Sequence, residues 1–262
     1  MMKKSVTEKT EKTIYAIVAI ATFFLAWSFI TTFTAAKETT PGPLQVLKLL
    51  VTSITTPIGR YTLYGHLYFS LRRVIIGYSV ATVLGIIVGI AMGTSRYAEA
   101  IIKPIFEMLR PIPPIAWIPL IILWFGVGEL PKYAIIFIGS FTNVTLNAYT
   151  GAQRVDPTLV GCARMLGTSD RDIFLRVILP SCMPQIFAGM QVALSTAWMA
   201  VLAAEMVGAQ EGCGWIILRG SDTTNIPLVL VGMVVIGLVG LFLATVMRAV
   251  ERKVCSWNIM DV

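Results

Sequence analysis

Charged residues are scarce in this sequence of 262 residues, at 13% of the chain. A soluble domain carries about twice that share, because most of its surface faces water. Hydrophobic residues make up 56% of the chain, and its mean hydropathy is +0.78. These values exclude a soluble globular protein and indicate that long parts of the chain face lipid.

Groups that carry chemistry are also scarce. His66 is the only histidine, which excludes bis-histidine haem and a proton relay built on imidazole. The sequence has no Gly-Lys pair and hence no phosphate-binding loop, so the chain is not expected to hydrolyse ATP. The four cysteines lie far apart, which favours neither a disulfide framework nor a metal site: Cys162, Cys182, Cys213 and Cys255. We therefore predict no enzymatic activity, bound cofactor or metal for this chain.

Six windows lack Asp, Glu, Lys and Arg over about the 20 residues that a helix needs to cross a bilayer. Their apolar runs are continuous rather than alternating, which favours helices over strands. The prediction is an all-helical integral membrane domain over 14–248, between tails at 1–13 and 249–262. Its six membrane-spanning helices are expected at about 14–33, 74–93, 106–128, 133–153, 177–205 and 226–247.

Positive charge is in excess, with 21 Lys and Arg against 14 Asp and Glu. No basic run is interleaved with aromatic residues, so the predicted partner is a lipid bilayer and not a nucleic acid. Most of the basic residues lie in segments on the same side as the N-terminus, so both termini are predicted to be cytoplasmic. The first apolar segment is longer than the core of a secretory signal, which favours a retained anchor.

A short helix is predicted on the membrane surface between the first two spans. After Pro41-Gly42-Pro43, apolar residues recur at helical spacing, with Lys48 and Ser53 off the stripe. The stripe consists of Leu47, Leu50, Val51 and Ile54. A lid packed on the second span is favoured over a ligand contact.

The segment 156–180 is predicted to form a compact elbow of two short helices on the cytoplasmic side. Asp156 is an N-cap followed by proline, and Gly167 is placed to end the first helix in a left-handed conformation. Ser169 and Asp172 resemble a capping box that starts the second helix. The first helix has one apolar face, which requires a socket that this chain does not supply: Leu159, Cys162, Ala163 and Leu166.

This segment resembles the EAA loop of permease subunits in binding-protein-dependent ABC importers. The motif reads Glu-Ala-Ala, three residues, Gly, nine residues, Ile, one residue, Leu-Pro. Its spacing is matched by Gly161, Cys162, Ala163, Gly167, Val177, Leu179 and Pro180. Two further stretches, 70–77 and the proline-rich 110–120, are similar to the nitrate, taurine and aliphatic sulfonate branch. One departure is that Gly161 stands where the motif has glutamate.

The resemblance implies a type I ABC importer permease fold in the bacterial plasma membrane, with a cytoplasmic coupling loop at 155–180. It implies a second permease, identical or related, and two ATPase subunits that hold ATP and Mg. It also implies an extracytoplasmic solute-binding protein. The implied solute is a small anion such as a sulfonate, taurine or nitrate, although the branch also includes permeases for pyrimidine precursors.

Candidate path residues lie on three of the predicted spans. In the third, prolines are expected to bend the cytoplasmic half, and the resemblance places Pro113, Pro114 and Trp117 beside the path. The fourth carries the polar pair Asn143 and Asn147. The fifth carries one stripe that includes polar residues: Gln191, Ser195, Trp198, Leu202 and Glu205. The resemblance implies that this span helps to line the path, which makes Gln191, Ser195 and Trp198 candidates and puts Glu205 near the outer gate. For each set, packing or hydrogen bonding between helices is an equally good interpretation.

Two rival functions remain open. A secondary transporter would couple the solute to ions by itself, but it predicts intramembrane ionisable pairs and inverted repeats, which are not evident. A structural subunit of a larger membrane complex would have no transport activity.

Arg72 and Arg73 could attract an anionic solute or could extend to the membrane interface. The glycines at four-residue spacing along the second span predict close helix packing.

Overall fold

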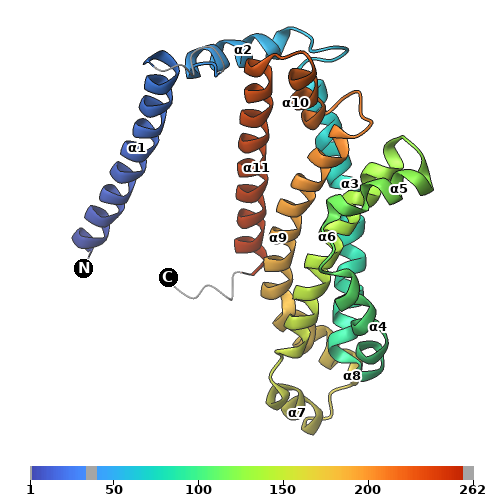
Figure 1. Cartoon of the computed structure of the whole chain (residues 1–262). Helices are drawn as coiled ribbons and strands as arrows, with labels where there is room; N and C mark the ends of the chain where they lie inside the picture. The colour runs from blue at the N-terminus through green and yellow to red at the C-terminus, as the bar shows by residue number, and fades with distance from the viewer. Residues whose placement is uncertain (1, 34–39, 256–262) are drawn as a thin grey trace. The chain divides into compact units, whose positions relative to one another are not determined.

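The computed structural model describes residues 2–33 and 40–255. Regular structure in this part of the chain is helical, apart from one antiparallel bridge between Ile58 and Tyr61. Residues 256–262 of the predicted C-terminal tail lie outside the described residues. The elements are, in chain order (Figure 1), α1 Met2–Phe33, α2 Pro43–Thr55, α3 Leu63–Thr94, α4 Arg96–Leu109, the 3-10 helix η2 Pro114–Trp117, α5 Ile118–Phe125, α6 Glu129–Gln153, α7 Pro157–Met165, α8 Asp170–Ile173, the π-helix η3 Phe174–Ile178, α9 Leu179–Met206, α10 Cys213–Asp222 and α11 Ile226–Val254.

Four helical stretches are long and apolar enough to cross a membrane: Thr13–Phe33, Leu63–Thr94, Asp170–Met206 and Ile226–Val254. The bent pair of α4 and α5 makes a fifth if it counts as one span. α6 has 25 residues and coincides with the predicted span 133–153. The all-helical membrane class is therefore confirmed, and the count of six spans stays a prediction.

The chain divides into two compact units. The first comprises Met1–Tyr64 and Ile216–Val234. In it, α2 confirms the predicted short helix, but Val46 and Ser53 are its buried residues, while Leu47 and Val51 are exposed. The placement of this stripe against a membrane surface or against the second span stays a prediction.

The second unit comprises Gly65–Trp215 and Val235–Val262 and holds α3 to α9. The glycine ridge of α3 packs against α6, as predicted. A Cβ on Gly77 would lie 2.8 Å from the Ile136 side chain, and one on Gly89 would lie 2.5 Å from the Thr145 carbonyl oxygen. Only glycine permits this approach of the two backbones.

The span expected at about 106–128 is broken at the proline run, where the sequence predicts a bend. α4 ends at Leu109, and α5 starts after η2 at an angle of 87° to α4. The cause is the proline run, since Pro111, Pro113 and Pro114 lack amide donors and disfavour helical backbone in the residues before them. The predicted bend is confirmed, and the segment 96–109, expected to connect two spans, is itself a helix.

The second short helix expected in the elbow is continuous with the membrane-spanning helix that follows it. α8, η3 and α9 follow one another without a break from Asp170 to Met206. Pro180 falls in the first turn of α9, and the π-helical turn before it accommodates the missing proline donor. The elbow therefore joins α9 through continuous helix (Figure 1).

Candidate coupling loop and translocation path

The first helix of the elbow, α7, is capped at both ends as the sequence predicts. The Asp156 carboxylate accepts the Thr158 amide at 2.8 Å, and this hydrogen bond lowers the pKa of that carboxyl. Gly167 has φ +74°. The Gly167 amide donates to the Arg164 carbonyl at 3.0 Å and the Thr168 amide to that of Ala163 at 3.1 Å, which together form a Schellman motif.

The turn into α8 is closed by the predicted capping residues. Ser169 Oγ accepts the Asp172 amide at 3.2 Å and donates to the Asp172 carboxylate at 2.7 Å. Arg176 pairs with the same carboxylate at 3.2 Å. With both helix starts capped and a glycine stop between them, the elbow is a locally ordered unit rather than a loose connection.

The tip of the elbow is apolar and exposed. Met165 is 90% and Leu166 85% exposed, and Leu159 and Cys162 are also exposed, while Ala163 is half-buried. A Cβ at Gly161 would meet open space. The motif residues Val177, Leu179 and Pro180 lie apart from this tip, half-buried where the elbow joins α9. The sequence motif did not single out Met165, although it is the most exposed apolar side chain there.

Asn143 and Asn147 connect α6 to α9. Asn143 Nδ2 donates to the Gly139 carbonyl and to Thr196 Oγ1, both at 3.1 Å. Asn147 Oδ1 accepts Gln185 Nε2 at 2.9 Å. These contacts match the alternative interpretation of hydrogen bonds between helices, and Thr196 and Gln185 are polar partners that the sequence did not reveal.

Of the predicted stripe on α9, the first two members are partly accessible. Gln191 Nε2 donates to the Glu251 carboxylate, which lies on α11. Ser195 is exposed and its hydroxyl donates to the Gln191 carbonyl at 3.2 Å. Ser195 shares the exposed side of α9 with Val192 and Met199.

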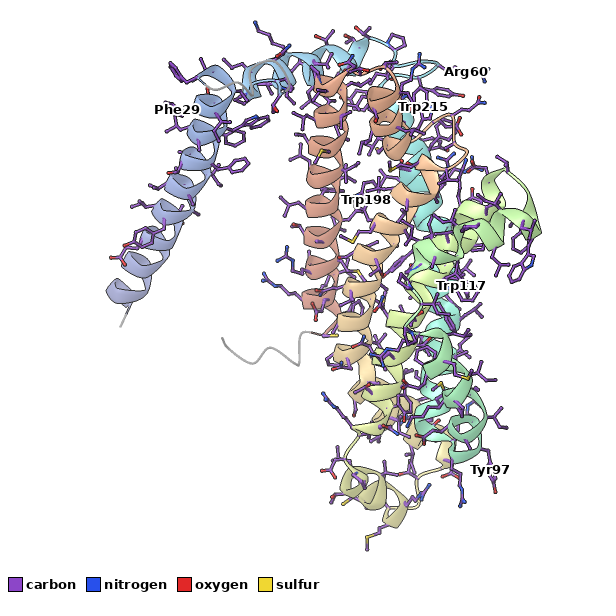
Figure 2. The ribbon with its side chains drawn as sticks, in the orientation of Figure 1. Phe29, Arg60, Tyr97, Trp117, Trp198 and Trp215 are labelled. Atoms are coloured by element: carbon purple, nitrogen blue, oxygen red, sulfur yellow. The ribbon has the colours of Figure 1, made fainter. Side chains whose placement is uncertain are left out.

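The other two members of the stripe do not line an open path in this structure. Trp198 (Figure 2) is buried in a core with Val74 and Ile136, and its Nε1 donates to the Ile236 carbonyl at 3.1 Å. Glu205 is 0% exposed and is held by an arginine. The periodicity grouped these residues on one face correctly but could not distinguish a face in contact with water from one in contact with protein.

Arg73 organises a buried ionic network that the sequence did not predict. Its five guanidinium N–H groups all have acceptors: the Glu129 carboxylate at 2.8 and 2.6 Å, Glu205 at 2.9 Å, and the side chain and carbonyl of Glu211 at 2.7 and 2.9 Å. Glu205 also accepts the Ser70 hydroxyl at 2.8 Å and the Gly214 amide at 2.9 Å. Arg73 is 1% exposed and has no donor left for a solute.

Pro113 and Pro114 meet Asn143 in a cavity of about 200 Å³. Its other walls come from the start of the proline-rich segment, the middle of α6 and Thr196 on α9: Arg110, Ile112, Ile138, Gly139, Thr142 and Leu146. Trp117 does not line this cavity but an adjoining one, and its Nε1 is buried without a partner. The structure thus brings together three of the nine predicted path residues.

The comparisons with known proteins agree with this architecture. The family model described as "Binding-protein-dependent transport system inner membrane component" matches residues 81–255. The chain belongs to this family. Permease subunits of this kind are not catalytic, because a separate ATPase hydrolyses the ATP.

Relatives match most of the permease. A probable ABC transporter permease protein of Brucella abortus is 38% identical over 83% of this chain and 86% of its own. The taurine transport system permease protein of Escherichia coli is 36% identical, over 83% and 80%. The nitrate import permease protein of Synechocystis is 31% identical, over 93% and 90%. These relatives support the nitrate, taurine and sulfonate branch.

A solved structure gives the fold independently. The MetNI methionine ABC transporter in an inward-facing conformation has a chain that matches with a TM-score of 0.63 at 18% identity, over 71% of this chain and 93% of that one. The type I importer permease fold expected from the sequence is therefore confirmed.

Proposed function

We propose that this permease forms the translocation path of an ATP-driven importer for a small anion of the taurine, sulfonate or nitrate kind. Its similarity to permeases for taurine, aliphatic sulfonates and nitrate supports this solute class. The observation that carries the proposal is the elbow, in which a doubly capped helix leaves the side chains of Leu166 and Met165 exposed at its tip. Large apolar side chains at that exposure require a partner surface.

The partner we propose is an ATPase dimer that binds ATP and Mg, with one subunit holding each elbow. A second copy of this permease or a relative completes the path, and an external binding protein delivers the solute. Both termini are cytoplasmic in this arrangement. ATPase closure would move 156–180 as a rigid body. Because helix is continuous from Asp170 to Met206, that movement is transmitted along α9 and alternates access to the path.

A pull-down experiment tests the proposal. The tagged permease is purified from its native membrane in mild detergent, and the proteins that accompany it are identified by mass spectrometry. We expect an ATPase with a phosphate-binding loop in near-equal amount, and we expect Leu166→Asp to lose it, because a charge enters an apolar socket. Leu166→Met is the matched control. A permease that is recovered alone and moves solute without ATP would support the secondary-transporter rival.

A further inference from the structure

Two cavities of the second unit meet at Arg110. The first, of about 200 Å³, is the partly polar one beside Pro113 and Asn143. The second, of about 380 Å³, is apolar and is lined by side chains of α4 and α6 that include Ile105, Phe137 and Phe141. Both cavities are bordered by Arg110, Ile138 and Thr142. A ligand could therefore place a polar group in one cavity and an apolar group in the other.

Arg110 lies level with the middle of α6. Its cavity neighbours on that helix, Ile138 to Asn143, lie roughly 14–17 Å from the nearer helix end at 1.5 Å per residue. A lipid phosphate would sit near the end of a spanning helix, not at its middle. An ionisable side chain at such depth is rare and marks solute or ion pathways.

The charge of Arg110 is only weakly compensated. Its one ion pair among the described residues is with Glu107 on its own turn, at 3.8 Å, and the two side chains are 43% and 50% exposed. Arg73, by contrast, has every donor occupied. Arg110 is also the one ionisable residue among those that line the two cavities.

Apart from Arg110, the polar side chains that line the smaller cavity are uncharged. The hydroxyls of Thr142 and Thr196 donate to the carbonyls of Ile138 and Gly139, at 3.1 and 2.9 Å. These protons are therefore engaged, and Arg110 is the principal group left to hold an anion. The apolar cavity next to it favours an uncharged, hydrophobic body.

We infer that Arg110 binds the anionic group of the transported solute midway along the path, while the apolar cavity receives the body of that solute. The solute class is thus a small organic anion with an alkyl or aryl body, such as an alkanesulfonate, rather than a bare inorganic anion. This inference rests on the proposed function, since it assigns the solute site of the same path.

The test uses the permease–ATPase complex in nanodiscs of zwitterionic lipid, with 1-hexanesulfonate and methanesulfonate as probes. We expect hexanesulfonate to bind at least tenfold more tightly. Arg110→Gln should weaken both probes at least tenfold, and Ile105→Trp, which fills the apolar cavity, should weaken hexanesulfonate only. Arg96→Gln is the control, because it removes the same charge from the exposed start of α4, outside both cavities.

Three results would overturn the inference: a wild type that binds no hexanesulfonate, equal binding by Arg110→Gln and Arg96→Gln, or hexanesulfonate binding insensitive to Ile105→Trp. If anionic lipid displaces hexanesulfonate from the wild type and Arg110→Gln loses co-purified anionic lipid, the cavities are a lipid site. ATP-driven uptake by the wild type, measured in parallel, tests the proposed function separately. Uptake that persists in Arg110→Gln would refute the site and leave the importer intact.

Discussion

Replacing Arg73 should destabilise the permease more than any other single charge change in the described residues. Arg73→Gln removes the guanidinium that donates to Glu129, Glu205 and Glu211. Glu129 and Glu211 are 45% and 23% exposed and can recover hydration. Glu205 is 0% exposed and keeps only the Ser70 hydroxyl and the Gly214 amide as donors. The cost is therefore dominated by one buried, uncompensated carboxylate.

Breaking a buried ion pair by removal of one partner costs about 3–5 kcal/mol. For a chain of this size that corresponds to a fall in Tm on the order of 10 °C. The measurement is thermal unfolding of the purified protein in detergent. Arg72→Gln is the control, because Arg72 is adjacent and exposed, and its loss should change stability by about 0.5 kcal/mol or less.

A double variant shows whether the lost stability comes from the unpaired charge of Glu205 or from the lost packing of the Arg73 side chain. Glu205→Met in the Arg73→Met background removes the orphaned carboxylate, so it should recover much of the lost stability. The reasoning is refuted if Arg73→Gln unfolds at the same temperature as Arg72→Gln. It is also refuted if the double variant is less stable than Arg73→Met alone.

Three further outcomes follow from the packing and the elbow. Gly167→Val should abolish ATP-driven transport while the protein still inserts, because a β-branched residue is strongly disfavoured at φ +74°, whereas Gly167→Asn should retain transport; transport by the valine variant would contradict the elbow geometry. Leu166→Asp should abolish ATP-driven transport by releasing the ATPase, while the thermal stability of the free permease stays unchanged, since the side chain contacts solvent there. Gly89→Ala should lower Tm, because its Cβ would lie 2.5 Å from the Thr145 carbonyl oxygen, while Gly237→Ala, with open space around it, should not; equal Tm values for these two would contradict the close packing of α3 on α6.

Local signals predicted the local structure well. The caps of α7, the left-handed Gly167 and the proline-induced break are each fixed by the chemistry of one or two residues, and the structure has all of them. The family motif fixed the position of the elbow and, through it, the class of protein. These local features and the family motif do not depend on contacts between residues distant in the sequence.

The candidate path could be predicted only in part. Helical periodicity placed Trp198 and Glu205 on one face of α9 but could not show that this face is buried, since that depends on α3 and on the loop after α9. The same limit hid the Arg73 network, because the three glutamates lie 56 to 138 positions from Arg73 in the sequence. The sequence predicted the bend beside Arg110, but it could not show that this bend brings Arg110 against α6, because that contact joins residues distant in the sequence.

ATP-driven uptake into proteoliposomes tests the central claim most directly. The permease is reconstituted with its ATPase, the binding protein and labelled solute are placed on the outside, and ATP is enclosed within. The account predicts that solute accumulates only when ATP, ATPase and binding protein are all present, and that Leu166→Asp abolishes the accumulation. Accumulation by the permease alone, without ATP, would contradict it.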